Sequence, residues 1–361
     1  MTQARDLADL AGAATGGGLT GRSMLINGAF QIWQRGYSAT TVSGDDIFAA
    51  DRFKGWANGG GTFTVERSTD VPNNEFEFSA KLTNTATDSS VAAGDDYRWA
   101  TDIEGYIVSP LAYGSSDAKT ATLSFWVKSS LAGTYCGAFY STTASRHYIY
   151  EYTISSADTW EYKTITVDGD TTGSWNRTNG NGLRVYWGLG SGSDAQGTAD
   201  AWASGEKWET TNQEAWIGSS SATFFITGVK LEIGQTATPF DHEGYGAVLA
   251  KCQRYYYRIG PHSAGEFGAG LHNTTSQATV WVPFQAEMRT KPTAVENSST
   301  LANFDVRTNN SIYTLSSLTY QAATKHGAAI LCNHGGTSTQ GEATLVRFRT
   351  VNDWIAWGAE L

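Results

Sequence analysis

The segment FFITGVKLEIGQTATPFDHEGYGAVLAKCQRYYYR, residues Phe224–Arg258, decides how the chain is organised. Apolar residues alternate along Thr223–Ile233 (Phe225, Thr227, Val229, Leu231, Ile233), which predicts a strand with one buried face. Asp241 is expected to cap a helix, because a carboxylate accepts the free amide hydrogens of a first turn. The apolar stripe of that helix falls at helical spacing on Tyr245, Val248, Leu249 and Cys252. Gln253–Ile259 returns to a strand pattern, so this segment predicts a junction between two β-rich regions.

The composition favours an all-β protein. The 361 residues include 40 Gly, only 6 Pro, 17 Tyr, 15 Phe and 13 Trp, so strand formers alternate with turn residues. Roughly ten strand-like runs precede residue 241, with no helix among them, and this spacing predicts a two-sheet jelly roll. In the clearest run, Leu123, Phe125 and Val127 face one way and Ser124, Trp126 and Lys128 face the other.

Charge and hydropathy argue against several classes of function. The formal net charge is −10, and an acidic surface repels a phosphate backbone, so no nucleic-acid partner is expected. No apolar run reaches the ~20 residues that span a bilayer, and no secretion signal is recognised, so membrane insertion is not expected. The widely spaced Cys136, Cys252 and Cys332 are expected to be buried free thiols.

Four segments carry a resemblance to a known family. They are LINGAFQIWQRG (Leu25–Gly36), AADRF (Ala49–Phe53), GVKLEIGQTATPFDHEGYGAVLAKCQRYYYR (Gly228–Arg258) and WIAWGAEL (Trp354–Leu361). Together they resemble segments of tail-fibre and other fibre proteins of tailed bacteriophages, over nearly all of the chain after residue 24. The resemblance implies a carbohydrate-binding-module-like β-sandwich, a homotrimer, and a place on the virion, at the phage tail or capsid surface, after synthesis in the host cytoplasm.

The predicted fold is an N-terminal jelly-roll β-sandwich, a connecting short α-helix and a smaller C-terminal β-sandwich domain. Residues 1–23 are predicted to be an attachment or oligomerisation segment, and residues 24–240 a jelly-roll domain of the carbohydrate-binding kind. Residues 241–258 form the linking helix and strand, and residues 259–361 the C-terminal β domain. A helix within residues 1–23 is too short to be stable alone, so it is expected to bundle with other copies or to dock to another virion protein. The alternative is a frayed tail.

Aromatic side chains in turn-rich segments are the candidate glycan-binding residues, because a Trp ring packs on the apolar C–H face of a sugar. The segments TTGSWNRTNGNG and ADAWASGEKWETTNQEAW provide Trp175, Trp202, Trp208 and Trp216, with Glu209 and Asn212 as polar partners. The alternative is that these aromatics anchor long loops to the sandwich. The aromatics within strands, Trp99, Trp126, Tyr186 and Trp187, are expected in the core or an interface.

No catalytic site is predicted. Glycoside hydrolysis needs two carboxylates about 5–10 Å apart across a cleft, whereas neighbouring acids in turns are usually solvated or bound to backbone amides. The pairs concerned are Glu206/Glu209, Asp45/Asp46, Asp95/Asp96 and Asp168/Asp170. Of these, Asp95/Asp96 and Asp168/Asp170 are also candidate ligands of a structural calcium; no other cofactor is expected. The histidines, including His326 and His334, are expected to be exposed and solitary.

The sequence therefore predicts a non-catalytic virion fibre protein that attaches the particle to a host-surface glycan. The alternatives are a head fibre or capsid decoration protein, and a glycan-degrading tailspike enzyme.

Overall fold

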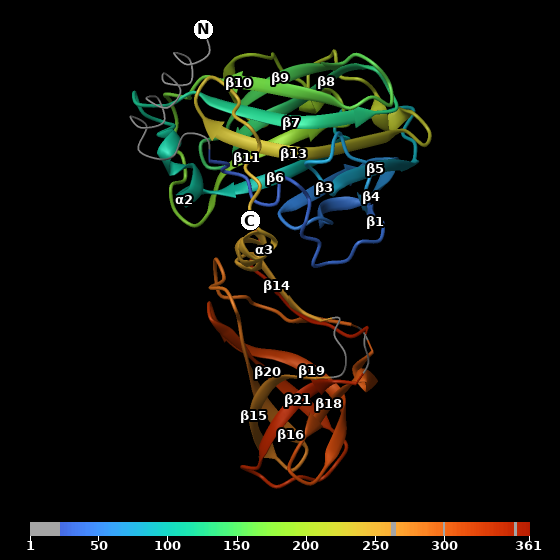
Figure 1. The fold of residues 1–361 in the computed structure, drawn as a ribbon, viewed down its shortest axis with the longest axis vertical. Helices are drawn as coiled ribbons and strands as arrows, with labels where there is room; N and C mark the ends of the chain where they lie inside the picture. Colours follow the sequence, from blue (N-terminus) through green and yellow to red (C-terminus); the bar gives the residue numbers. More distant parts are fainter. Residues whose placement is uncertain (1–21, 261–264, 299, 350–351) are drawn as a thin grey trace. The chain divides into compact units, whose positions relative to one another are not determined.

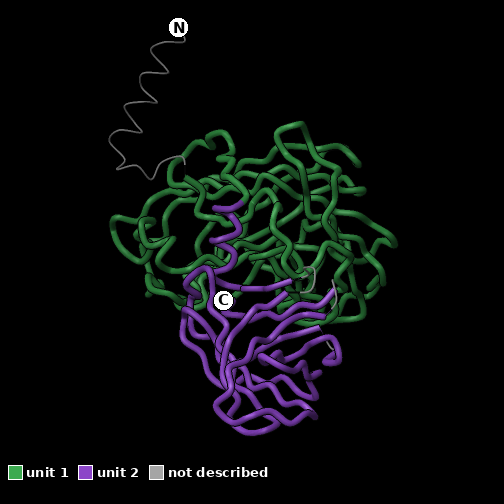
Figure 2. The backbone as a smooth tube through the Cα atoms, turned by 60° about the horizontal axis from the view of Figure 1, so that its bottom comes forward, with its two compact units in different colours: residues 1–245, 361 green, residues 246–360 purple. Residues whose placement is uncertain are grey.

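The computed structural model describes residues 22–260, 265–298, 300–349 and 352–361. The predicted attachment segment, residues 1–23, lies almost entirely outside these ranges. Within them the chain is all-β, as predicted, and the longest helix has nine residues. No helix in this part of the chain has the length and apolar character needed to cross a bilayer. The chain divides into two compact units, residues 1–245 with Leu361, and residues 246–360 (Figure 2).

The first unit is a sandwich of two antiparallel sheets (Figure 1), which confirms the predicted jelly-roll architecture. The six-stranded sheet contains, in spatial order, β1 (Thr40–Val42), β4 (Thr62–Ser68), β5 (Ser79–Ala86), β13 (Thr223–Ile233), β7 (Ala121–Ser129) and β10 (Glu161–Val167). The seven-stranded sheet contains β12 (Trp202–Ser204), β9 (Arg146–Ile154), β8 (Gly133–Ser141), β11 (Asn181–Gly188), β6 (Asp96–Glu104), β3 (Phe53–Asn58) and β2 (Gly44–Phe48). Short helical turns lie between strands: α2 (Gly105–Val108) and the 3₁₀ turns Ser109–Leu111, Ser193–Ala195 and Trp216–Gly218.

Large aromatic and aliphatic side chains fill the space between the two sheets. On β7 the alternation holds as predicted, because Leu123, Phe125 and Val127 are fully buried in this core. Phe125 meets Trp187 edge to face, with ring centroids 5.8 Å apart. Trp126 is not part of the core and lies on the outer face of the sheet, as its place in the alternation requires.

Strand β13 departs from the predicted alternation. Its register against β7 shifts between Thr227 and Lys230, and Gly228 there has a left-handed φ of 62°. The core-facing residues are therefore Phe224 and Ile226 before this β-bulge and Val229 and Leu231 after it. The prediction that Phe225 and Thr227 face the core was wrong, because one extra residue in a strand exchanges its two faces.

The second half of β13 pairs with a segment near the start of the described chain. The Val229 amide donates to the Gly28 carbonyl oxygen (3.0 Å), and the Met24 amide donates to the Leu231 carbonyl oxygen (2.7 Å). A Cβ atom on Gly28 would lie 2.0 Å from the Val229 carbonyl oxygen, so only glycine fits there. The segment around Gly28 and the second half of β13 are therefore structural partners.

The second unit contains a closed barrel and a small sheet. The barrel strands, in spatial order, are β15 (Glu266–Thr274), β16 (Gln277–Pro283), β20 (Gly327–His334), β19 (Ile312–Thr324), β18 (Phe304–Arg307) and β21 (Ala343–Phe348). The small sheet has the order β14 (Tyr256–Ile259), β22 (Ile355–Gly358) and β17 (Glu296–Asn297), and a 3₁₀ turn spans Leu301–Asn303. The expected smaller β domain is present, but its main sheet closes on itself, because β15 pairs with both β16 and β21.

Two local predictions in this region need correction. The linking helix is α3 (Tyr245–Gln253), and it begins four residues after Asp241, which therefore does not cap it. His334 is buried rather than exposed. Its Nε2 atom lies 3.0 Å from that of the buried His272, and its ring stacks on Tyr313 at an interplanar angle of 8°.

The three cysteines, Cys136, Cys252 and Cys332, are free and buried, as predicted.

Candidate functional site

Trp175 and Trp202, two of the predicted sugar-binding residues, lie together in a packed aromatic cluster. Their ring centroids are 5.4 Å apart at 89°, and Tyr113 meets both rings edge to face. The Trp175 indole N–H donates to the Thr172 carbonyl oxygen, and that of Trp202 donates to the Asp168 carbonyl oxygen. Both indoles therefore anchor loops by their polar edges.

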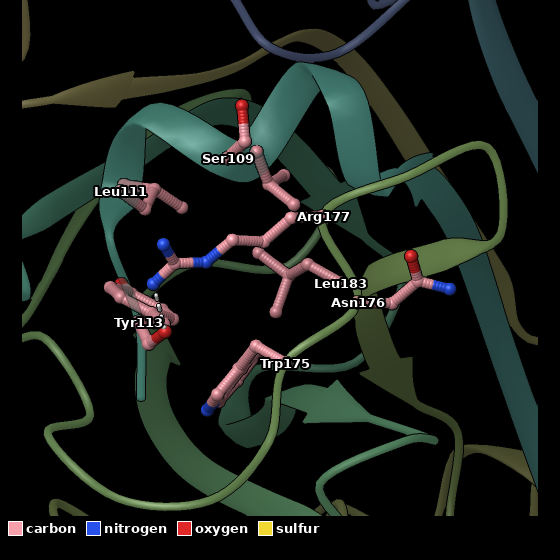
Figure 3. Close-up of a pocket in the computed structure, with 8 residues that line it drawn as sticks. Ser109, Leu111, Tyr113, Trp175, Asn176, Arg177 and Leu183 are labelled. Carbon is pink, nitrogen blue, oxygen red and sulfur yellow. Dashed lines mark hydrogen bonds between the residues drawn. The ribbon is translucent and has the colours of Figure 1, made fainter. Parts of the chain in front are cut away.

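A small cavity beside Trp175 is shown in Figure 3. Its lining consists of Val108, Ser109, Leu111, Tyr113, Trp175, Asn176, Arg177 and Leu183. The Arg177 guanidinium points toward Tyr113 and donates to its carbonyl oxygen (2.9 Å). The cavity measures about 10 Å³, and a single water needs roughly 10–15 Å³, so no sugar ring fits.

Trp216 and Glu209 are fully buried. The Trp216 ring packs edge to face on Phe63 in the core of the sandwich. The Glu209 carboxylate accepts the backbone amides of Gly190 (3.1 Å) and Ser191 (2.8 Å). Burial raises the pKa of Glu209 to about 7, and those two hydrogen bonds oppose the rise. Neither side chain is exposed to a ligand.

Trp208 covers a buried charge on the outer face of the seven-stranded sheet. The Arg98 guanidinium lies over three rings, those of Trp208, Tyr186 and Trp56, at 4.0, 4.5 and 4.7 Å. It forms ion pairs with Glu206 and Asp96, both at 2.9 Å. Burial raises the pKa of Asp96 to about 6, with Arg98 opposing the rise.

The predicted carboxylate pair Glu206/Glu209 therefore does not flank an open cleft. One acid is held by Arg98 and the other by backbone amides. Asn212, the last of the predicted site residues, is exposed and donates to Glu151. The six predicted residues do not converge on one surface.

The candidate calcium ligands are also engaged elsewhere. Asp170 is buried and accepts two hydrogen bonds from Arg146 (2.6 and 3.1 Å), and Asp168 accepts the Thr120 hydroxyl (3.1 Å). Nowhere in the described ranges do three or more His, Cys, Asp or Glu side chains gather as metal ligands would.

An open groove lies instead on the outer face of the six-stranded sheet. It has a volume of about 410 Å³ and is lined by Glu75, Phe76, Trp126, Tyr162, Gly228, Ala237, Thr238, Pro239 and Phe240. Trp126 of β7 and Tyr162 of β10 face each other directly across the ladder, with ring centroids 5.2 Å apart at 50°. Tyr162 is 43% exposed. Two neighbouring strands thus present a pair of aromatic rings on a rigid surface.

The β-bulge of β13 forms part of the lining of this groove at Gly228. A Cβ atom on Gly228 would lie 2.8 Å from the Phe76 ring and 3.2 Å from the Trp126 ring. Glycine at position 228 therefore lets these two rings lie close over the bulge without a clash, and the left-handed φ also favours glycine there.

A folded-back loop forms another part of the lining. The buried Lys230 ammonium donates to the Pro239 carbonyl oxygen (2.8 Å), and the buried Glu232 carboxylate accepts the Thr238 amide (2.8 Å). The two side chains lie 3.3 Å apart as an ion pair. Phe240, just beyond this clamp, packs edge to face on Phe76 with ring centroids 5.3 Å apart.

The groove offers polar groups as well as aromatic rings. Among the described residues, no side chain bonds to the Trp126 indole N–H, the Tyr162 hydroxyl or the Glu75 carboxylate. The site can therefore pack an apolar face and exchange hydrogen bonds with hydroxyls.

None of the residue patterns in the sequence predicted this groove. Trp126 was expected in the core or an interface because the residue lies within a strand. The outward direction of Trp126 was readable from the alternation in β7, but the adjacency of Tyr162 depends on which strands pair.

Comparisons with known proteins give weak similarities only. No family model matches the chain, and no curated protein matches it. The enzymatically active domain of tailspike protein 4 from bacteriophage CBA120 is similar with 14% identity and a TM-score of 0.31, over 59% of this chain and 21% of that one. A CBM4 structure has 14% identity and a TM-score of 0.31, over 58% of this chain and 98% of that one. The family 11 carbohydrate-binding module of a Clostridium thermocellum cellulosomal cellulase has 14% identity and a TM-score of 0.28, over 56% and 98%. TM-scores of this size do not establish a shared fold, so the fold assignment rests on the two sheets themselves.

Proposed function

We propose that this chain is a non-catalytic glycan-binding protein of a phage particle, and that the groove over Trp126 and Tyr162 holds the sugar. The pair formed by the half-buried Trp126 and the exposed Tyr162 on neighbouring strands carries the proposal. A pyranose packs its C–H face on such rings, while its hydroxyls meet the Trp126 N–H, the Tyr162 hydroxyl and Glu75. Because β7 and β10 already hold the rings in place, binding costs these side chains little conformational entropy.

The groove suits a short stretch of glycan bound with modest affinity. Its volume of about 410 Å³ lies toward the lower end of the ~300–1,000 Å³ of small-molecule sites. A homotrimer, which the sequence resemblance implies, would carry three grooves. Their combined strength on a cell surface would exceed that of one groove through effective concentration.

The groove binds without cleaving in this proposal. Glu75 is the only acid that lines it, whereas glycoside hydrolysis uses two carboxylates on opposite sides of the bond. The acid pair suspected from sequence, Glu206 and Glu209, is engaged by Arg98 and by backbone amides. The bound polysaccharide is therefore released unchanged.

The proposed location of the chain on the phage particle rests on the sequence resemblance alone. In this proposal residues 1–23 dock to other virion proteins, and the chain serves as a tail fibre or, alternatively, a head fibre or capsid decoration protein. Light scattering on the purified full chain tests the trimer. Electron microscopy of virions with a labelled antibody tests the location.

Binding of the full chain to an array of bacterial surface oligosaccharides tests the groove. Trp126→Ala and Tyr162→Ala should each weaken binding by about tenfold or more, which is about 1.4 kcal/mol. Tyr106→Ala is the matched control, because Tyr106 on α2 is 59% exposed and does not line the groove. Undiminished binding by Tyr162→Ala would rule the groove out. Release of reducing ends from a bound glycan would refute the non-catalytic assignment.

A further inference from the structure

We infer that the groove selects a glycan that carries an ammonium group, supplied either by an amino sugar or by a choline-type substituent. The inference rests on the proposed function and adds the charge of the ligand. It follows from the aromatic walls, from one acid among them, and from the ion pairs that hold the three lysines of the same sheet face.

Four of the lining residues are aromatic, Phe76, Trp126, Tyr162 and Phe240. The face of an aromatic ring attracts a cation that lies within about 6 Å, and several rings around one site are the usual way to bind a quaternary or primary ammonium. Phe76 and Trp126 lie close over Gly228, where a Cβ atom would be 2.8 Å from the Phe76 ring and 3.2 Å from the Trp126 ring. The four rings together give the groove aromatic faces on which an ammonium group can lie.

Glu75 supplies the matching negative charge. It is the only carboxylate in the lining, its side chain is exposed, and no described cation forms an ion pair with it. Two more exposed acids, Glu77 and Asp241, each follow directly after an aromatic wall residue. The local charge of the groove is therefore negative.

The lysines on this sheet face are already neutralised by partners. Lys128 of β7 pairs with Asp70, which also accepts the Trp160 indole N–H. The other two pairs are Lys81 with Glu66 (2.8 Å) and the buried Lys230 with Glu232 (3.3 Å). An acidic sugar would find these three lysines already paired and would be repelled by Glu75, whereas an ammonium group meets both the acid and the rings.

Two tetramers that differ in their N-acetyl groups test the inference: chitotetraose, which is uncharged, and its fully deacetylated form, which carries ammonium groups. The full chain should bind the deacetylated tetramer about tenfold or more tightly, and added salt should reduce this preference. Glu75→Gln should remove the preference. Glu66→Gln, which changes a paired acid on the same face, should retain it.

Choline chloride distinguishes the two sources of the ammonium group. If choline binds and the deacetylated tetramer does not, the ammonium group belongs to a choline-type substituent. If the deacetylated tetramer binds and choline does not, the group belongs to an amino sugar. Equal or tighter binding of the acetylated tetramer at low salt, or a preference that persists in Glu75→Gln, overturns the inference. If array glycans then still bind in a Tyr162-dependent way, the proposed function stands; if none does, the proposed function falls as well.

Discussion

The buried Lys230–Glu232 pair gives the sharpest test of how the groove is built. Both side chains are 1% exposed, and the Lys230 ammonium also donates to the Pro239 carbonyl oxygen. Lys230→Met keeps the apolar stem and removes the charge. Breaking a buried pair from one side costs about 3–5 kcal/mol, because the remaining charge stays buried without its partner. We expect the free energy of unfolding of the first unit to fall by that amount.

A second lysine on the same sheet provides the matched control. Lys81 pairs with Glu66 at 2.8 Å, but the two side chains are 30% and 36% exposed. Exposed pairs are worth about 0–1 kcal/mol, so Lys81→Met should change stability little. In the double variant Lys230→Met/Glu232→Gln no lone buried charge remains, so part of the stability should return.

Denaturant unfolding followed by tryptophan fluorescence measures this difference. Three of the 13 tryptophans, Trp281, Trp354 and Trp357, lie beyond residue 245, so the other ten report on the first unit. The Lys230→Met chain should also bind glycan more weakly, because the loop that carries Phe240 loses its clamp. A stability loss under about 1 kcal/mol, equal to that of Lys81→Met, would refute the reasoning.

Three further predictions concern buried groups. The pKa of Glu209 is raised to about 7, so between pH 4.5 and 7 this carboxyl binds more protons in the folded first unit than in the unfolded chain. The stability of the first unit should therefore fall by about 3 kcal/mol as pH rises from 4.5 through 7. Denaturant titrations across this range should show a flatter pH profile for Glu209→Gln. Burial, with His272 nearby, holds the pKa of His334 below its ordinary value, so the second unit should lose stability as pH falls below about 6.5. Hydrogen exchange of the barrel amides should report that loss, and His334→Gln should remove its pH dependence. Trp216→Ala should cost about 3–5 kcal/mol in thermal unfolding because it empties part of the core, whereas the exposed Tyr106→Ala should stay within about 0.5 kcal/mol.

The sequence by itself determined the class of fold and much of the local structure. Alternating side chains in β7 put Leu123, Phe125 and Val127 on one face and Trp126 on the other, because successive residues of a strand point to opposite faces, and the structure shows that the first face is the core. The helix α3 followed from its apolar spacing, although its start did not, because the chain between Asp241 and Tyr245 is not helical.

Tertiary structure decided where the candidate site lies. Trp126 meets Tyr162 because β7 pairs with β10, and Lys230 reaches Pro239 because the chain folds back over β13. Turn-rich surroundings suggested exposure for Trp175 and Trp216, yet both are buried. The physical reason is that strand pairing and loop closure depend on contacts between residues far apart in the chain, and a single extra residue at Gly228 exchanges the faces of β13.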